Sequence, residues 1–524
     1  MDLEKALALK TLDGLEPAEA LDAVGILFDH VIDFGDLELN SKVLAWSEAL
    51  EPSLAGVDLV KLDYYRANGW ANVDHNHRQD RERAWAWDQE PLQQQVLLLR
   101  RALNREAFKD VPAHVQCQIL TNLGNQMSLV GRFVESREYW SRALEALPEF
   151  WMARFNRGFG LMAYARCLYD PGHRDVLAVS AHSDMTKAIA SLDAHPEYGD
   201  PRLRPAFVAE AAHIAKHIDM EAFAANYDPD AFTLGEDAQE QAYRKWCLSQ
   251  SLFLNPLNDA GPHSIAACDV MQLPTFVTAI GQKPLVLGLF NQLKQEFISA
   301  RWIYYEGITA EGMHFSDRDA PLYNTLDYPV FGLAAEKVKV AYRMSYSLFD
   351  KIAFFLNHYL KLGIPSTQVM FRHVWKDKKT GALRPAFANT ENLAFRGLYW
   401  LSKDFFDEEL KDTTEPEART CHDLRNHLEH KYLKLHWLLV DTPEATSAGS
   451  DLFKDDLAYS LKVSDLEQRT LRMLKLARSA LIYLLLGMHR EEERRRAESG
   501  SDGLTAPMPI HMADDFFKQR QVLR

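Results

Sequence analysis

The chain has 524 residues, of which 47% are hydrophobic and 25% are charged. This is the composition of a globular protein, which excludes a largely disordered chain, and the length suffices for two to four domains. Its 59 basic and 74 acidic side chains give a formal charge of −15, which repels nucleic acid at long range and excludes a general DNA or RNA coat. Any RNA contact must come from a local basic site, and another protein is the more natural partner of the surface as a whole.

The N-terminal residues, MDLEKALALKTLDGLEPAEA, lack the basic-then-apolar order of a signal peptide. The longest strongly apolar run, around Ala480 to Met488, is too short to cross a bilayer. The cysteines are Cys117, Cys167, Cys247, Cys268 and Cys421. This odd and scattered set contains no close pair, which indicates reduced thiols. We therefore expect a cytoplasmic protein with no membrane partner.

A repeat begins at Cys117. Counted from it, small residues stand at positions 8, 20 and 27, a large one at 24 and a proline at 32: Gly124, Ser136, Ala143, Trp140 and Pro148. This spacing resembles that of tetratricopeptide repeats, in which small residues let two helices approach and proline ends the second helix. The next unit begins at Trp151 and has Gly158 at position 8. We therefore expect residues 1–260 to form a tetratricopeptide-like helical array, a sensor or interaction domain, with a plain helical hairpin as the alternative.

The segment Leu254 to Ser264, LNPLNDAGPHS, is rich in Asn, Pro and Gly and indicates an exit from the array. A connector is expected over 261–283 and a helical bundle over 284–490. Apolar periodicity and capping residues predict its five helices at 285–306, 336–362, 391–410, 416–440 and 464–489. Val369 to Phe387 has two extended runs around a Lys-Thr-Gly turn and predicts a small inserted β-hairpin. Residues 442–456 are expected to be a polar loop, and 491–524 a charged helix end and tail.

The densest chemistry lies from Cys421 to His436, CHDLRNHLEHKYLKLH. Arg425 and His430 form an Arg-x-x-x-x-His pair near the start of the fourth bundle helix, and Asn426 follows the arginine. The spacing alone is as frequent as chance predicts. Its weight comes from its place on a long helix of a five-helix bundle.

With this motif, the region resembles the HEPN superfamily of helical-bundle nucleases. The family pattern of Arg, a polar residue and His is matched by Arg425, Asn426 and His430. The longer form with Tyr432 resembles HEPN toxins in which a partner nucleotidyltransferase modifies the tyrosine. A core tyrosine is the alternative for Tyr432. The expected fold class is therefore all-α, with a tetratricopeptide-like array followed by a HEPN bundle. The inserted hairpin departs from the minimal family bundle.

The resemblance implies cofactor-independent and metal-independent RNA cleavage that leaves a 2′,3′-cyclic phosphate and a 5′-hydroxyl. His430 would be the general acid or base, Arg425 would hold the phosphate, and Asn426 would orient one of them. His427, one turn before His430, is either an auxiliary group or part of a polar helix face. A bacterial toxin or antiphage effector, with a protein or peptide trigger bound by the array, fits this resemblance.

Helix geometry adds a homodimer to these expectations. Residues five apart diverge by about 140° on an α-helix, so one Arg425 and one His430 converge poorly on a single phosphate. Two copies that face each other across a dimer seam would bring the groups together. We therefore expect the bundle to dimerise.

Two basic stretches are candidates for further RNA contacts. Lys431 and Lys434 can extend a positive patch beside the motif. The hairpin carries Arg372, Lys376, Lys378 and Lys379. Together with Trp375 they can grip the RNA backbone and stack a base, and a solvated turn is the alternative.

Two other classes of protein share some of these sequence features. A zinc enzyme needs His-Glu-x-x-His or His-x-x-Glu-His on a helix, and position 426 is Asn where the second pattern needs His, which leaves only a non-helical metal site open. A non-catalytic module that uses its repeats and bundle only for protein interaction or assembly also stays open.

Overall fold

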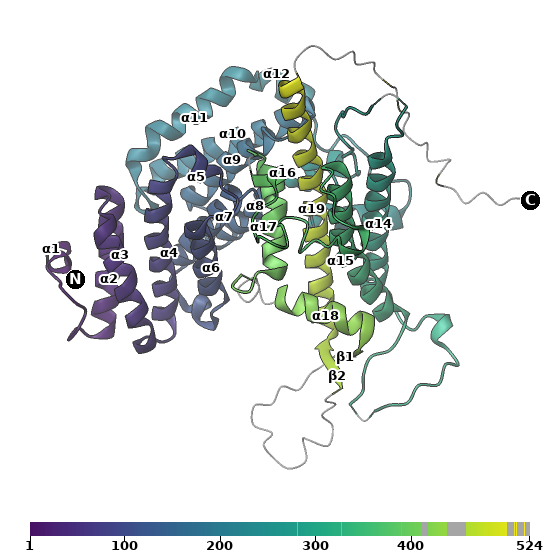
Figure 1. The fold of residues 1–524 in the computed structure, drawn as a ribbon, viewed down its shortest axis with the longest axis horizontal. Helices are drawn as coiled ribbons and strands as arrows, with labels where there is room; N and C mark the ends of the chain where they lie inside the picture. Colours follow the sequence, from purple (N-terminus) through teal and green to yellow (C-terminus); the bar gives the residue numbers. More distant parts are fainter. Residues whose placement is uncertain are drawn as a thin grey trace, which may run out of the picture.

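The computed structural model describes residues 1–279, 281–325, 327–388, 390–410, 418–437 and 457–499, with residues 508, 510 and 518. These residues are mainly helical, as expected for an all-α protein. They form two parts, a helical array and a helical bundle (Figure 1). The predicted loop at 442–456 and most of the predicted tail beyond Ser499 lie outside the described residues.

The array extends from the N-terminus to the 3₁₀ turn η5 (Pro256–Asp259). Its α-helices are α1 (Leu3–Leu7), α2 (Pro17–Phe34), α3 (Leu37–Leu50), α4 (Val57–His77), α5 (Arg81–Trp85), α6 (Glu90–Asn104), α7 (Ala113–Leu129), α8 (Phe133–Ala146), α9 (Trp151–Ala165), α10 (Pro171–Ala194), α11 (Arg204–His217), α12 (Met220–Asn226) and α13 (Ala238–Ser249). Successive long helices pack side by side in Figure 1.

The small-against-large packing predicted for the repeat is present between α7 and α8. A methyl group on Gly124 would lie 2.6 Å from Trp140 Nε1, so this position has no room for a side chain. The same indole donates to the Thr121 carbonyl at 3.2 Å and is 1% exposed. Gly160 of α9 meets the other end of the ring, because a methyl there would lie 2.3 Å from Trp140 Cζ3. Trp140 therefore holds three helices together.

The described part of the bundle contains five long helices: α14 (Leu285–Ile308), α15 (Leu333–Tyr359), α17 (Leu393–Phe406), α18 (Ala418–His430) and α19 (Val463–Ser499). The short α16 (Pro385–Ala388) precedes α17. The apolar core of α19 is complete along its middle, where residues 480–486 and Met488 are at most 1% exposed. Helix α14 packs on α15, and both α15 and α17 pack on α19, so α19 is the central helix (Figure 1).

The fourth bundle helix is shorter than predicted. It ends at His430, and the next residues form strand β1 (Tyr432–His436), which pairs in parallel with β2 (Ala458–Lys462). On its other edge, Leu435 accepts a hydrogen bond at 2.7 Å from the backbone N–H of Val330. The extended conformation is therefore stabilised by backbone partners on both sides, which the helical period of the segment does not reveal.

The predicted hairpin at Val369–Phe387 is reduced to one antiparallel bridge between Lys376 and Leu383. Backbone hydrogen bonds from Asp377 to Ala382 at 2.8 Å and from Arg384 to Trp375 at 2.9 Å close it. The indole of Trp375, in this insertion, is 1% exposed and packs between Trp87 of the array and Phe387. The insertion is thus fixed to the body of the protein by its aromatic residue.

The array and the bundle share one hydrophobic core. Asp404 of α17 accepts from Arg100 of α6 at 2.7 Å and from Arg132, which precedes α8. On α19, Arg478 pairs with Asp259 at 2.9 Å, and both side chains are at most 2% exposed. The LNPLND segment, predicted to be an exit from the array, is therefore a buried turn between the two parts.

At one point the two parts meet backbone to backbone. A methyl on Gly397 of α17 would lie 2.2 Å from the Gly131 carbonyl oxygen, and Gly131, in the turn between α7 and α8, has a φ of +92°. Only glycine at both positions allows this approach without displacement of the backbone. None of the described helices is long and apolar enough to span a membrane.

Candidate active site

Helix α18 lies across one end of the bundle, beside β1 and β2 (Figure 1). It turns Leu424, which is fully buried, and Leu428 toward the core. At 100° per residue, Arg425 and Glu429 then lie on one flank and His427 on the other. Asn426 and His430 fall on the face opposite the core. The helix thus separates the motif residues into a flank and an outward face.

Arg425 lies against α15. Its guanidinium carbon is 5.8 Å from the centre of the Tyr346 ring, and Nη1 donates to Asn426 Oδ1 at 3.3 Å. Tyr346 is 8% exposed, so the ring is a fixed support. A cation held against an aromatic face and by a neighbouring amide keeps its remaining N–H groups available to an anion.

His430 is the last residue of α18 and is exposed. The described residues include no hydrogen-bond partner for its imidazole. His427 is half-buried and stacks on Tyr459 of β2, with ring centres 4.9 Å apart. His430 is therefore the imidazole of the pair that solvent or a ligand can reach, and His427 fixes α18 to the sheet.

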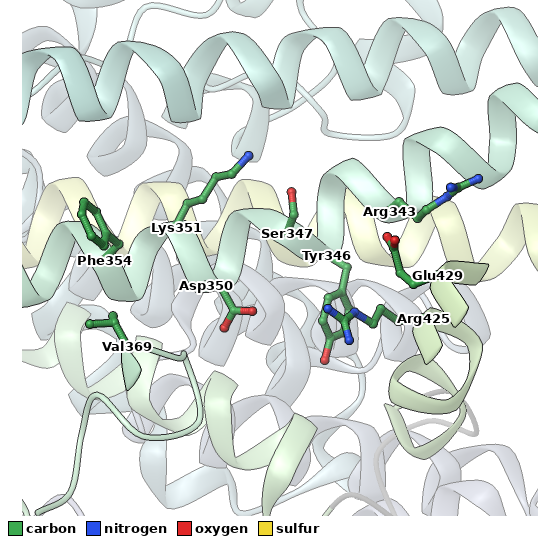
Figure 2. A pocket seen from close by; sticks show the side chains of 9 residues that line it. All are labelled: Arg343, Tyr346, Ser347, Asp350, Lys351, Phe354, Val369, Arg425 and Glu429. Carbon is green, nitrogen blue, oxygen red and sulfur yellow. The ribbon is translucent and has the colours of Figure 1, made fainter. Parts of the chain in front are cut away.

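A pocket of about 330 Å³ opens beside Arg425, between α15 and α18 (Figure 2). Its lining residues are Arg343, Tyr346, Ser347, Asp350, Lys351, Phe354, Val369, Arg425 and Glu429. The six from α15 follow one another at three-residue and four-residue intervals or as adjacent pairs, so they form a single stripe along the helix. Lys351 forms an ion pair with Glu296 of α14.

The residues beyond the motif do not form the patch that the sequence indicates. Lys434 cannot extend an exposed positive patch, because its side chain is 4% exposed and pairs with Asp327 at 2.8 Å. Lys431 is exposed. Tyr432 is 41% exposed at the start of β1. Asp327 explains the difference, since it lies in the long segment between α14 and α15 and reaches β1 only in the folded chain.

The basic side chains of the predicted hairpin also differ in whether they are exposed or paired within the protein. Arg372, Lys378 and Lys379 are exposed, whereas Lys376 pairs with Asp88 of the array at 2.8 Å. Burial, and after it the neighbouring cations Arg372 and Lys378, lower the pKa of His373. The predicted stacking of a base on Trp375 is wrong, because that ring is buried.

Sequence reasoning missed most of the pocket. Arg343, Tyr346 and Ser347 were not recognised as candidate site residues. The available signal was the interval of three and four residues at which polar side chains interrupt the apolar pattern of α15. In the described part of the chain, no group of three or more His, Cys, Asp or Glu side chains is placed to hold a metal ion.

A helical bundle with an Arg-Asn-x-x-x-His helix at one end defines the class of this site. Residues 277–491 match the family model described as LA2681-like HEPN. This match supports the HEPN superfamily for the bundle, and it does not include the array. A search of the curated proteins and a search of the solved structures found no match.

Proposed function

We propose that the bundle is a metal-independent endoribonuclease whose active site is assembled from the α18 helices of two copies of the chain. The observation that carries the proposal is the arrangement of α18 in the region that matches the HEPN family. Asn426 and His430 lie on its outward face, and Arg425 is held on the adjoining flank. A second α18 that faces the first would supply the groups that one helix directs elsewhere.

The reaction that fits these side chains is transesterification within RNA. The 2′-oxygen attacks the adjacent phosphorus and loses its proton to one imidazole, while the bond from phosphorus to the 5′-oxygen breaks. The 5′-oxygen gains a proton from water, so each site needs one His430 and one Arg425. Arg425 would stabilise the charge on the phosphoryl oxygens, and its hydrogen bond to Asn426 would orient it.

Mutation of the motif tests the activity. Purified full-length protein is incubated with total RNA in the presence of EDTA, and Arg425→Ala and His430→Ala are compared with it. We expect each variant to lose about 10²–10⁴-fold in rate, and the wild-type products to carry 2′,3′-cyclic phosphates. His213→Ala on the exposed side of α11 is the matched control and should cut normally. Equal decay of RNA in all four samples would show contamination and would favour the non-catalytic interaction module.

Mixing the variants tests the composite site. If one copy provides Arg425 and the other His430, dimers that combine Arg425→Ala with His430→Ala contain an intact site and regain part of the activity. Light scattering after size exclusion measures the oligomer. A strict monomer that still cuts RNA would contradict the shared site and leave the nuclease proposal standing.

We further propose that the array holds the nuclease at a low basal activity, which rises when the array binds a protein or peptide trigger, as in a toxin or an antiphage effector. The sharing of one core by the array and the bundle supports this proposal, because a change in the array reaches α17 and α19 directly. Induced expression should arrest growth, and expression of His430→Ala should not.

Tyr432 is exposed enough for an enzyme to modify it, and intact mass after growth arrest would reveal an added nucleotide.

A further inference from the structure

The pocket beside Arg425 contains Arg343, an arginine that has no partner among the described residues. No hydrogen bond or ion pair to Arg343 is found among the described residues, and its Nε is buried. Arg343 is half-buried, whereas three fully buried arginines each pair with a carboxylate: Arg100 with Asp404, Arg301 with Asp269 and Arg478 with Asp259. A buried N–H without an acceptor is unfavourable, and a bound anion would supply the acceptor.

The groups that line the pocket follow an order along α15. Arg343 and Arg425 lie at one end, Asp350 in the middle, and Phe354 with Val369 at the other end (Figure 2). Arg343 and Phe354 are eleven residues apart, which is about 16 Å along an α-helix. Phe354 is 43% exposed, so its ring is accessible from the pocket. An anionic group, a hydrogen-bonding group and a flat apolar group can therefore bind in this order.

The charge of the pocket limits the ligand. Its cations are Arg343, Lys351 and Arg425, and its carboxylates are Asp350 and Glu429. Because Lys351 is already paired with Glu296, the remaining charges balance. One phosphodiester, with a single negative charge, suits this balance better than a free nucleoside triphosphate does.

We propose that this pocket binds one nucleotide of the RNA next to the scissile phosphate. Its phosphate contacts Arg343, its base lies against Phe354, and Asp350 accepts hydrogen bonds from the base. This inference rests on the proposed nuclease function, since Arg425 lies in both sites. It adds a residue, Arg343, that binds RNA, and a residue, Asp350, that selects the base.

Asp350 is placed to discriminate between bases. One of its oxygens accepts from the backbone N–H of Phe371 at 2.9 Å, which holds the carboxylate in place. The other oxygen has no partner in the described chain. A carboxylate accepts from the amino groups of adenine, cytosine and guanine, whereas uracil has only one ring N–H to offer. The pocket should therefore prefer a base with an amino group to uracil.

Binding to an uncut RNA tests the pocket separately from catalysis. In the full-length His430→Ala protein, affinity is measured by fluorescence anisotropy with labelled oligoadenylate, oligocytidylate and oligouridylate. We expect Arg343→Ala to weaken binding at least tenfold and Phe354→Ala to weaken it severalfold. Arg202→Ala, which removes an exposed arginine of the array, should bind like the parent. Circular dichroism checks folding, and Arg343→Lys, which keeps the charge, should bind between the parent and Arg343→Ala.

Asp350→Asn gives the readout that a structural role would not change. Its amide can donate to the uracil carbonyl, so the ratio of oligoadenylate to oligouridylate affinity should fall toward one. Unchanged binding in Arg343→Ala and Phe354→Ala, or a preference retained by Asp350→Asn, would overturn the inference even if Arg425 and His430 prove catalytic. Loss of binding in a protein that never cuts RNA would support the pocket and contradict the nuclease.

Discussion

Asp404 of α17 joins the bundle to the array through two buried arginines, Arg100 and Arg132. Burial alone would raise its pKa, but the Arg100 and Arg132 guanidinium groups lower it to about 2 from its ordinary value of 3.8. A carboxyl with a lowered pKa stabilises the fold above the unfolded pKa and loses that contribution as the pH falls through the folded pKa. The stability that Asp404 contributes is therefore present above about pH 4 and declines toward pH 2.

Asp404→Asn should remove this contribution at neutral pH. It leaves the buried guanidinium of Arg100 without its counter-charge and that of Arg132 with Glu135 alone, and we expect a loss of about 3–5 kcal/mol. Thermal melting followed by circular dichroism measures the effect. Asp193→Asn, which breaks an exposed pair with Arg204, is the control and should cost less than about 1 kcal/mol. A similar shift in both variants would contradict the stabilising role of the buried pair.

At the residue scale, the face of a helix on which a residue lies can be predicted from the sequence more reliably than the burial of its side chain. The period of α18 correctly separates Arg425 from His430. It could not predict that Lys434 is buried, because its partner Asp327 is 107 residues away. Trp375 is buried for the same kind of reason, since Trp87 of the array packs on it. These contacts form only in the tertiary fold, so the local sequence pattern does not predict them.

At the scale of the element, Gly124→Ala should destabilise the repeat. Its methyl would meet the Trp140 ring, which is rigid and surrounded by α7 and α9, and the strain should cost about 1–3 kcal/mol. Gly288→Ala in α14 is the matched control. Nothing lies within 4 Å of the added methyl there, so the variant should gain up to about 1 kcal/mol from helix propensity. Melting temperatures that move in the same direction in both variants would contradict this account.

The elements themselves were predictable to different degrees. Capping residues and apolar period identify α14, α15, α17 and α19, because a long amphipathic helix repeats its signal many times. The segment that forms β1 is only five residues long, so the strand-like alternation of its leucines at 433 and 435 is a weak signal after the long helical pattern that precedes it. The segment forms a strand because its backbone pairs with β2 and with Val330, which are distant in the sequence.

At the scale of the whole molecule, the division of the chain into residues 1–260, 261–283, 284–490 and 491–524 stays a prediction. The array and the bundle, which this division separates, pack closely against each other. Residues 284–490 expressed alone would expose the faces of α17 and α19 that cover α6 and α8. We expect this fragment to be insoluble, because buried ionic and aromatic groups would lose their partners.

Co-expression of residues 1–283 with this fragment should restore solubility, because it returns Arg100, Arg132 and Asp259 to their partners. Soluble yield and near-ultraviolet circular dichroism are the measurements. A fragment that melts cooperatively by itself, at the temperature of the full-length protein, would show that the contacts between the two parts add nothing to stability.

The glycine contact between Gly131 and Gly397 has a consequence for how such proteins can diverge. A recombination event that joined this bundle to an unrelated array would bring together a turn and a helix that were not shaped for each other. The hybrid would need a glycine on both sides of the seam. Arrays and bundles of this kind are therefore expected to be inherited as a pair, with variation arising through surface substitutions.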